Sequence, residues 1–186
     1  MNWESAVQSL IDDPAQQALV EACYFDPPLD RAAARYADGA EWRAIRDLLD
    51  DADNATDRKG VAVDIGAGNG IVSYALARDG WETIAIEPDP SDLVGAGAIR
   101  RLARKTGVVI DVRDGYGEGL PVESGTARLV IARQVLHHAR DLPAFCREIA
   151  RILSTGGQLV TARDHVITDT SQLQPFLDAL PLHRHY

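Results

Sequence analysis

A glycine-rich stretch with two carboxylates carries the clearest chemistry of this 186-residue chain. Val63 to Gly70 reads Val-Asp-Ile-Gly-Ala-Gly-Asn-Gly, and Asp64 lies just before the first glycine. Glycines allow the backbone to turn sharply and a ligand to approach the main chain. The second carboxylate, Glu87, follows about twenty residues later and ends the next apolar run, where a carboxylate can accept both hydroxyls of a ribose.

The spacing of these residues separates two kinds of nucleotide cofactor. Dinucleotide-binding loops follow G-x-G-x-x-G, but the third glycine position is occupied here by Ile71. Asp64 would repel a pyrophosphate and attract a cationic amino group. An amino group at one end and a nucleoside at the other describe S-adenosylmethionine rather than a nicotinamide dinucleotide. The alternative interpretation is a glycine turn that only packs.

Alternating strands and helices are predicted to position these residues. Five short apolar runs predict strands at Val61–Ile65, Thr83–Glu87, Val108–Asp111, Arg128–Ala132 and Gly157–Ala162. Strands that are apolar on both faces are typical of a parallel sheet covered by helices. The helices predicted between them are Asn69–Asp79, Ser91–Thr106 with Ser91 as N-cap, and a segment capped by Asp141 and closed by Gly156 and Gly157. This order predicts an α/β fold with a Rossmann-like open parallel sheet in three αβα layers.

The chain divides into three parts by composition. Residues 1–50 have helical periodicity and predict an N-terminal helical cap, residues 51–60 are polar and linker-like, and residues 61–186 hold the predicted cofactor domain. Three aromatic residues of the cap, Tyr24, Tyr36 and Trp42, either cover the site or pack in the core.

The amino-acid composition limits the kinds of partner and the cellular compartment that we expect for this protein. The net charge of -9 disfavours nucleic acid, and the basic cluster Arg100, Arg101, Arg104 and Lys105 reads as the solvated face of a helix. Cys23 and Cys146 match no metal-ligand spacing and indicate reduced thiols. Without a signal peptide or an apolar run long enough to span a membrane, we expect a cytoplasmic protein with no membrane partner.

From Gly60 to Val166 the chain resembles the class I S-adenosylmethionine-dependent methyltransferases, in particular the group named methyltransferase type 11. VDIGAGNG resembles the first motif of that family and IEPDP its acidic second motif. GYGEGLP resembles the segment after the third strand, and ARQVLHHARDLPAFCREIARILSTGGQLV resembles the fourth and fifth strands with their helix. The set is specific for fold and cofactor and carries no information on the acceptor.

The resemblance implies a cofactor site at the ends of four strands. Its predicted residues are Asp64, Gly66, Ala67, Gly68, Asn69 and Gly70 around the methionine part, Glu87, Pro88 and Asp89 at the ribose, Gly115, Tyr116 and Gly117 beside the adenine, and Gln134 and Val135 after the fourth strand.

Methyl transfer needs no metal, and it needs a general base only when the acceptor must lose a proton. His137 and His138, just beyond the fourth strand, are the candidate bases, and the alternative is that one packs and one caps a backbone group. His165 follows the fifth strand and either faces the substrate or packs in the core. His183 and His185 make an incomplete metal site.

Three departures from the family pattern bear on function. Tyr116 stands where the family offers an aspartate to the adenine, Ala127-Arg128 replaces a Phe-Asp pair, and Thr155 replaces a proline. After Ala162 we expect only a loop, a short helix at Ser171–Leu180 and a tail, without the last two strands of the family. Either the sequence is truncated, or the protein is a reduced form, or a partner supplies the missing edge. The uncovered fifth strand predicts self-association through the sheet edge.

Three functions remain open at this point. The first is a methyltransferase acting on a small-molecule acceptor. The second is a non-catalytic protein that binds S-adenosylmethionine or S-adenosylhomocysteine, favoured by Tyr116 and by the missing strands. The third is a dinucleotide-dependent oxidoreductase, which Asp64 and Ile71 disfavour.

Overall fold

A five-stranded parallel sheet forms the centre of the computed structural model, which describes residues 3–52, 59–164 and 169–179. The strands lie in the order β3-β2-β1-β4-β5, and every neighbouring pair is parallel. Their bounds are β1 Val61–Ile65, β2 Glu82–Ile86, β3 Ile110–Arg113, β4 Ala127–Arg133 and β5 Leu153–Ala162. The predicted Rossmann-like sheet is thereby confirmed.

Helices precede, connect and follow the strands. The N-terminal extension holds α1 Trp3–Asp12, the 3-10 turn η1 Pro14–Gln16, α2 Gln17–Ala22, α3 Leu29–Ala37 and α4 Ala40–Ala52. The connecting and C-terminal elements are α5 Ile71–Arg78, α6 Ala96–Thr106, the 3-10 turn η2 Leu136–His138, α7 Leu142–Ile152, the 3-10 turn η3 Thr170–Gln172 and α8 Leu173–Ala179. The helix α4 runs two residues into the range predicted as a linker.

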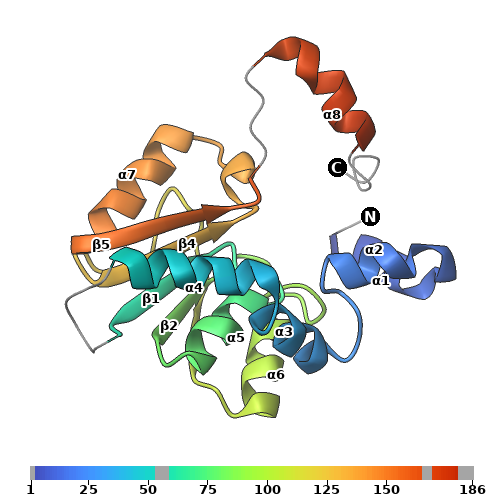
Figure 1. Ribbon diagram of the computed structural model, residues 1–186, viewed down its shortest axis with the longest axis horizontal. Coiled ribbons are helices and arrows are strands. Elements are labelled where there is room, and N and C mark those ends of the chain that lie inside the picture. The colour runs from blue at the N-terminus through green and yellow to red at the C-terminus, as the bar shows by residue number, and fades with distance from the viewer. Residues whose placement is uncertain (1–2, 53–58, 165–168, 180–186) are drawn as a thin grey trace.

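The sheet separates two hydrophobic layers because successive side chains of a strand point to opposite faces. Val63 and Ile65 of β1 pack with Phe145 and Ile149 of α7. Ala62, directly before Val63, points to the other face and packs in a cluster with residues of α3, α4 and α5. Figure 1 shows α7 on one side of the sheet and α3 to α6 on the other. The structure therefore has the predicted three layers.

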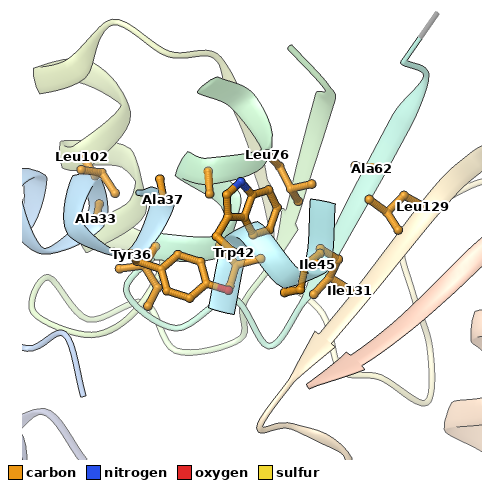
Figure 2. Close-up of a cluster of buried hydrophobic side chains, with 13 residues drawn as sticks. Ala33, Tyr36, Ala37, Trp42, Ile45, Ala62, Leu76, Leu102, Leu129 and Ile131 are labelled. Carbon is orange, nitrogen blue, oxygen red and sulfur yellow. The ribbon is translucent and has the colours of Figure 1, made fainter. Parts of the chain in front are cut away.

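The N-terminal cap contributes to the core. Tyr36 and Trp42 are fully buried, with their ring centroids 6.0 Å apart, and the indole Nε1 donates a hydrogen bond to Asp79. Figure 2 shows these two rings among side chains from the sheet and from α5. Of the two roles open for these residues, the structure supports packing. Tyr24 is half-buried and packs edge-on against Tyr36.

Several helix boundaries differ from the prediction, and both α5 and α8 begin two residues later than predicted. Ser91 does not cap α6: the helix begins at Ala96 after Gly95, because Glu4 of α1 accepts hydrogen bonds from the backbone N–H groups of Asp92 and Leu93 and holds the preceding turn apart. Gly156 and Gly157 do not close α7.

Both of these glycines, Gly156 and Gly157, lie inside β5, which begins at Leu153 directly after the helix. Asp141 does cap α7, accepting from Ala144 N at 2.9 Å. The predicted strands β2 and β3 also shift, by one residue toward the N-terminus and two residues toward the C-terminus respectively.

Beyond β5 the described residues hold only η3 and α8, as predicted, and no further strand. In Figure 1 α8 lies away from the sheet. The outer edge of β5 has no strand neighbour among the residues that the structure describes.

Candidate active site

The predicted site residues come together at one edge of the sheet. Parallel strands all end at the same edge. Asp64 lies within β1, one residue before its end, and the loops after β1, β2, β3 and β4 carry the other predicted residues. In folds of this kind, ligands bind in the crevice outside the carboxyl ends of the strands. The structure thus gathers the residues, and their role in binding stays a prediction.

The glycine loop after β1 follows a path that side chains would obstruct. Gly66, Gly68 and Gly70 all have positive φ, at 66°, 55° and 87°. A Cβ at Gly66 would lie 2.4 Å from a methyl group of Val135, so the loop after β4 packs directly on this glycine. Backbone N–H groups of Gly66 and Ala67 both donate to the Ile86 carbonyl, which ties the loop to the end of β2.

Asp64 is a buried carboxylate with one oxygen unsatisfied. Its Oδ2 accepts a hydrogen bond from the Ser73 hydroxyl at 2.6 Å, while Oδ1 has no partner among the described residues. Burial, with a smaller contribution from nearby Glu87, raises the pKa of Asp64 to about 7. Sequence reasoning missed Ser73, although a serine in the apolar first turn of α5 was a signal.

Backbone N–H groups of two loops, those after β1 and β2, hold the Glu87 carboxylate. Its Oε2 accepts from Gly68 N at 2.6 Å, and its Oε1 accepts from Asp89 N at 2.9 Å. Burial raises the pKa of Glu87, although these hydrogen bonds act in the opposite direction. An ionised carboxylate offers about four lone-pair positions, so each oxygen can still accept one hydroxyl. Pro88 lies beside it in the same loop.

The turn after β3 contains Gly115, Tyr116 and Gly117. A Cβ at Gly117 would lie 1.7 Å from the Phe145 ring, so α7 packs directly against this turn. Tyr116 is 62% exposed, and the Arg140 guanidinium lies 5.9 Å from its ring centre. The ring is available for stacking contact, in place of the hydrogen bond of an aspartate.

The loop after β4 carries Gln134, Val135 and the two histidines. Gln134 is exposed and has a φ of 54°, a conformation that few residues other than glycine adopt. His137 and His138 lie in η2 with ring centres 4.1 Å apart. Burial and the neighbouring His137 lower the pKa of His138.

A carboxylate that sequence reasoning missed contacts these histidines. Asp164, two residues past β5, places Oδ1 at 3.1 Å from His137 Nδ1 and 3.0 Å from the Leu136 backbone N. The signal was present in the sequence, since Asp164 follows a strand end much as Glu87 does.

A second missed cluster joins the cap to the ends of β4 and β5. Glu41 of α4 accepts hydrogen bonds from Arg133 Nε at 2.6 Å and from Arg163 at 3.4 Å. The Arg133 side chain is only 12% exposed and stacks on the Tyr36 ring at 5.4 Å. The positive charge of Arg133 lowers the pKa of Asp64, so this cluster acts on the carboxylate beside the glycine loop.

The cap also contacts the glycine loop directly, since Asn69 Nδ2 donates to the Tyr24 carbonyl at 2.9 Å. Asn69 further lines a cavity of about 590 Å³ between α1, the segment before α3, and α6. Its walls include Val7, Phe25, Leu93 and Leu102. Asn69 is the single predicted site residue in this wall, so the cavity lies beside the strand-end site.

Several predicted features lie outside the described residues, namely His165, His183 and His185. Within residues 3–52, 59–164 and 169–179, no group of three or more His, Cys, Asp or Glu side chains is arranged to hold a metal ion. No helix in those ranges has the length and apolar character to cross a membrane.

A family profile and the most similar curated sequences assign the chain to the same family. The profile of the family described as "Methyltransferase domain" matches residues 63–161, more than half of the chain. The ubiquinone biosynthesis O-methyltransferase of Azorhizobium caulinodans is 28% identical over 159 residues, covering 81% of this chain and 62% of that protein. The protein of the same name from Methylocella silvestris is 36% identical over 100 residues, covering 54% of this chain and 38% of the other.

Solved structures show the same fold. The YcgJ protein of Bacillus subtilis superposes with a TM-score of 0.61 at 22% identity, over 75% of this chain and 58% of that one. A putative sarcosine dimethylglycine methyltransferase from Galdieria sulphuraria has the same TM-score and identity, over 83% and 57% of the two chains. The chain thus spans less than two thirds of the length of each of these relatives.

Proposed function

The chain belongs to the class I S-adenosylmethionine-dependent methyltransferases, and we propose that it transfers a methyl group from S-adenosylmethionine to a small-molecule acceptor. The curated relatives named O-methyltransferases support this activity, as do the residues gathered at the strand ends.

One observation carries the proposal: the unpartnered Oδ1 of buried Asp64 beside the glycine loop. A buried carboxylate oxygen without a hydrogen-bond partner is costly, and a cationic amino group would satisfy it. The methionine part of the cofactor carries such a group, whereas a pyrophosphate would add negative charge. The residues present therefore fit S-adenosylmethionine.

Each predicted residue has a task in this proposal. Asp64 binds the amino group, the loop from Gly66 to Gly70 holds the methionine part against the backbone, and Glu87 accepts the ribose hydroxyls. The Tyr116 ring covers the adenine. S-adenosylmethionine, when bound, supplies a methyl group activated by its sulfonium charge.

The loop after β4 then orients the acceptor. Gln134 and Val135 flank the reacting centre, and either His137 or His138 removes a proton if the acceptor carries one. Most of the rate enhancement comes from positioning the acceptor in line with the methyl group and from excluding water.

Calorimetric titration with S-adenosylmethionine and S-adenosylhomocysteine tests the proposal. We expect micromolar binding by the wild-type chain and none by Asp64→Ala. The matched control is Asp38→Asn, which removes an exposed carboxylate paired with Arg78, the last residue of the helix that begins after the glycine loop. Absence of binding by folded wild-type protein would contradict the proposal.

A second candidate is a protein that binds S-adenosylmethionine or S-adenosylhomocysteine without catalysis. The exposed Tyr116 in the predicted adenine position favours it, because the family aspartate is missing there. Mass spectrometry for S-adenosylhomocysteine, formed during incubation with a panel of phenols, thiols and amines, separates the two. Titration with NAD excludes or supports the dinucleotide alternative in the same experiment series.

Two wider expectations belong to the same proposal. We place the activity in the cytoplasm, on the reduced state of Cys23 and Cys146. We also propose a homo-oligomer through the outer edge of β5, where Leu159 is 43% exposed. Sedimentation velocity of the wild type and of Leu159→Lys tests this association, which the lysine should weaken. No nucleic acid is expected as partner, given the net charge of -9.

A further inference from the structure

The carboxylate of Asp164 distinguishes two otherwise equivalent histidines. Its Oδ1 lies 3.1 Å from His137 Nδ1, and its side chain is 13% exposed against 31% for His137. The same oxygen accepts the Leu136 backbone N–H at 3.0 Å. These contacts connect the loop after β5 to η2 and fix the His137 ring relative to the end of β4.

The contact also determines where His137 carries its proton. A carboxylate only accepts hydrogen bonds, so the proton of the neutral ring lies on Nδ1 and the lone pair on Nε2. In addition, the Oδ2 of Asp164 is buried without a partner among the described residues. The carboxylate therefore orients the ring through Nδ1, so that Nε2 is the nitrogen that can accept a proton.

His138 has the less favourable surroundings for a base. Burial and the neighbouring His137 lower its pKa, so it accepts a proton less readily. The segment that carries both histidines contacts the glycine loop after β1, because Val135, just before η2, packs against Gly66. The His137 ring therefore lies on the segment that adjoins the predicted methionine pocket.

We propose that Asp164 and His137 form a dyad in which His137 is the general base and Asp164 its positioning residue. The acceptor that this dyad serves is a hydroxyl compound such as a phenol, because a hydroxyl is a weak nucleophile until it loses its proton, whereas an amine attacks through its free lone pair and a thiol ionises more readily. This inference rests on the proposed methyltransferase function and names the acceptor class for that same site.

The acceptor oxygen forms a bond to the methyl carbon while the carbon–sulfur bond breaks, and the electron pair of that bond remains on sulfur as the positive charge there is lost. The hydroxyl proton passes to His137 Nε2 and then to solvent. The products are a methyl ether, S-adenosylhomocysteine and one proton.

The tautomer of His137 is the first test, and it requires no turnover. Long-range ¹H–¹⁵N correlation spectra of the full chain, with resonances assigned through His137→Gln and His138→Gln, should show the Nδ1–H tautomer at His137. Asp164→Asn should redistribute the tautomers. Asp141→Asn, which alters another capping carboxylate, should leave them unchanged. An Nε2–H tautomer at His137 in the wild type would overturn the dyad.

Kinetics with catechol as probe acceptor form the second test. His137→Gln should lower kcat by about 10²-fold or more, the range of general base catalysis, while His138→Gln lowers it by less than about fivefold. Asp164→Asn should lower kcat by about tenfold with an unchanged KM for S-adenosylmethionine. The double variant should lose no more than His137→Gln alone, since the two residues act as one unit.

A structural role for Asp164 predicts different numbers. If Asp164 only caps η2, its loss adds to that of His137→Gln, and methylation of N,N-dimethylaniline, which has no proton to lose, falls equally. Either result would overturn the proposal. Binding of S-adenosylhomocysteine by each variant is measured in parallel. Its absence in the wild type would overturn the methyltransferase function itself, whereas the tautomer spectra still decide the dyad.

Discussion

The loop after β1 and the loops after β4 and β5 lie at the same edge of one sheet, but they are stabilised by different contacts. The first is built from glycines with positive φ and a buried carboxylate, and its partners are Ile86, at the end of the adjacent strand, and Glu87, directly after it. The others carry charged side chains that pair across long stretches of sequence. Glu41 and Arg133 are 92 residues apart, and His137 and Asp164 are 27 apart.

This difference has a functional meaning under the proposed activity. A cofactor that all family members share can be held by backbone geometry, which a short motif specifies. The acceptor differs between members, and exposed loops can change their side chains without disturbing the sheet. We therefore expect substitutions in the glycine loop to abolish cofactor binding, and substitutions in the charged cluster to leave it intact.

The largest effect is expected for Gly66→Ala. The new Cβ would lie 2.4 Å from a Val135 methyl group in a backbone with φ of 66°. Strain and overpacking together should cost about 2–4 kcal/mol of unfolding free energy. Binding of S-adenosylhomocysteine should weaken by about 100-fold or more, since the loop must shift.

Gly80→Ala is the matched control for this glycine. Its φ is 89°, but nothing lies within 4 Å of the added Cβ, so only the backbone strain of about 1 kcal/mol remains. Urea unfolding and calorimetry measure both variants. Equal cofactor affinity in the two would show that the contact with Val135 does not shape the site.

The next effect concerns pH and Asp64. Its pKa of about 7 reflects burial and repulsion from Glu87, opposed by Ser73 and Arg133. The amino group of the cofactor needs the ionised form, so affinity should fall by up to about tenfold per pH unit below pH 7. Calorimetry from about pH 5.5 to about pH 8.5, on both sides of that pKa, should show this dependence of affinity on pH. Asp64→Asn should bind the cofactor weakly at every pH.

Stability should change in the opposite direction. The pKa of Asp64 is raised in the folded chain above its ordinary value of 3.8, so the native state binds more protons than the unfolded state between these values. Unfolding free energy of the cofactor-free protein therefore decreases as pH rises from about 4 to about 7. Asp64→Asn should unfold at higher denaturant concentration than the wild type at pH 8, and equal midpoints there would contradict the assignment.

Much of the fold and of the cofactor end could be predicted because the relevant signals are local. Apolar runs gave the five strands, and Asp64, Gly66 and Glu87 each stand at a strand end in the sequence itself. Ser91 failed as a helix cap for the opposite reason. The turn it belongs to is held by Glu4, more than eighty residues earlier in the chain.

The acceptor end could be predicted only in part. His137 and His138 were recognisable from their residue type and their place after β4. Their partner Asp164 comes from a different loop, and the ion pair of Glu41 with Arg133 joins the cap to the sheet. The sequence shows that Asp164 follows a strand end, but no periodic or motif signal indicates which side chains pair over such separations, so the structure was needed to find these contacts.

The smallest effect on the cofactor is expected for Glu41→Gln. The substitution leaves the largely buried Arg133 without its carboxylate, which should cost about 1–3 kcal/mol of unfolding free energy, less than full removal because the amide oxygen still accepts a hydrogen bond. Affinity for S-adenosylhomocysteine should stay within about threefold, since no cofactor contact is predicted there. Asp92→Asn, which breaks an exposed pair with Arg101, should leave both quantities unchanged. If Glu41→Gln instead abolishes cofactor binding, the cap and the glycine loop form a single unit, and acceptor specificity cannot vary independently of the cofactor site.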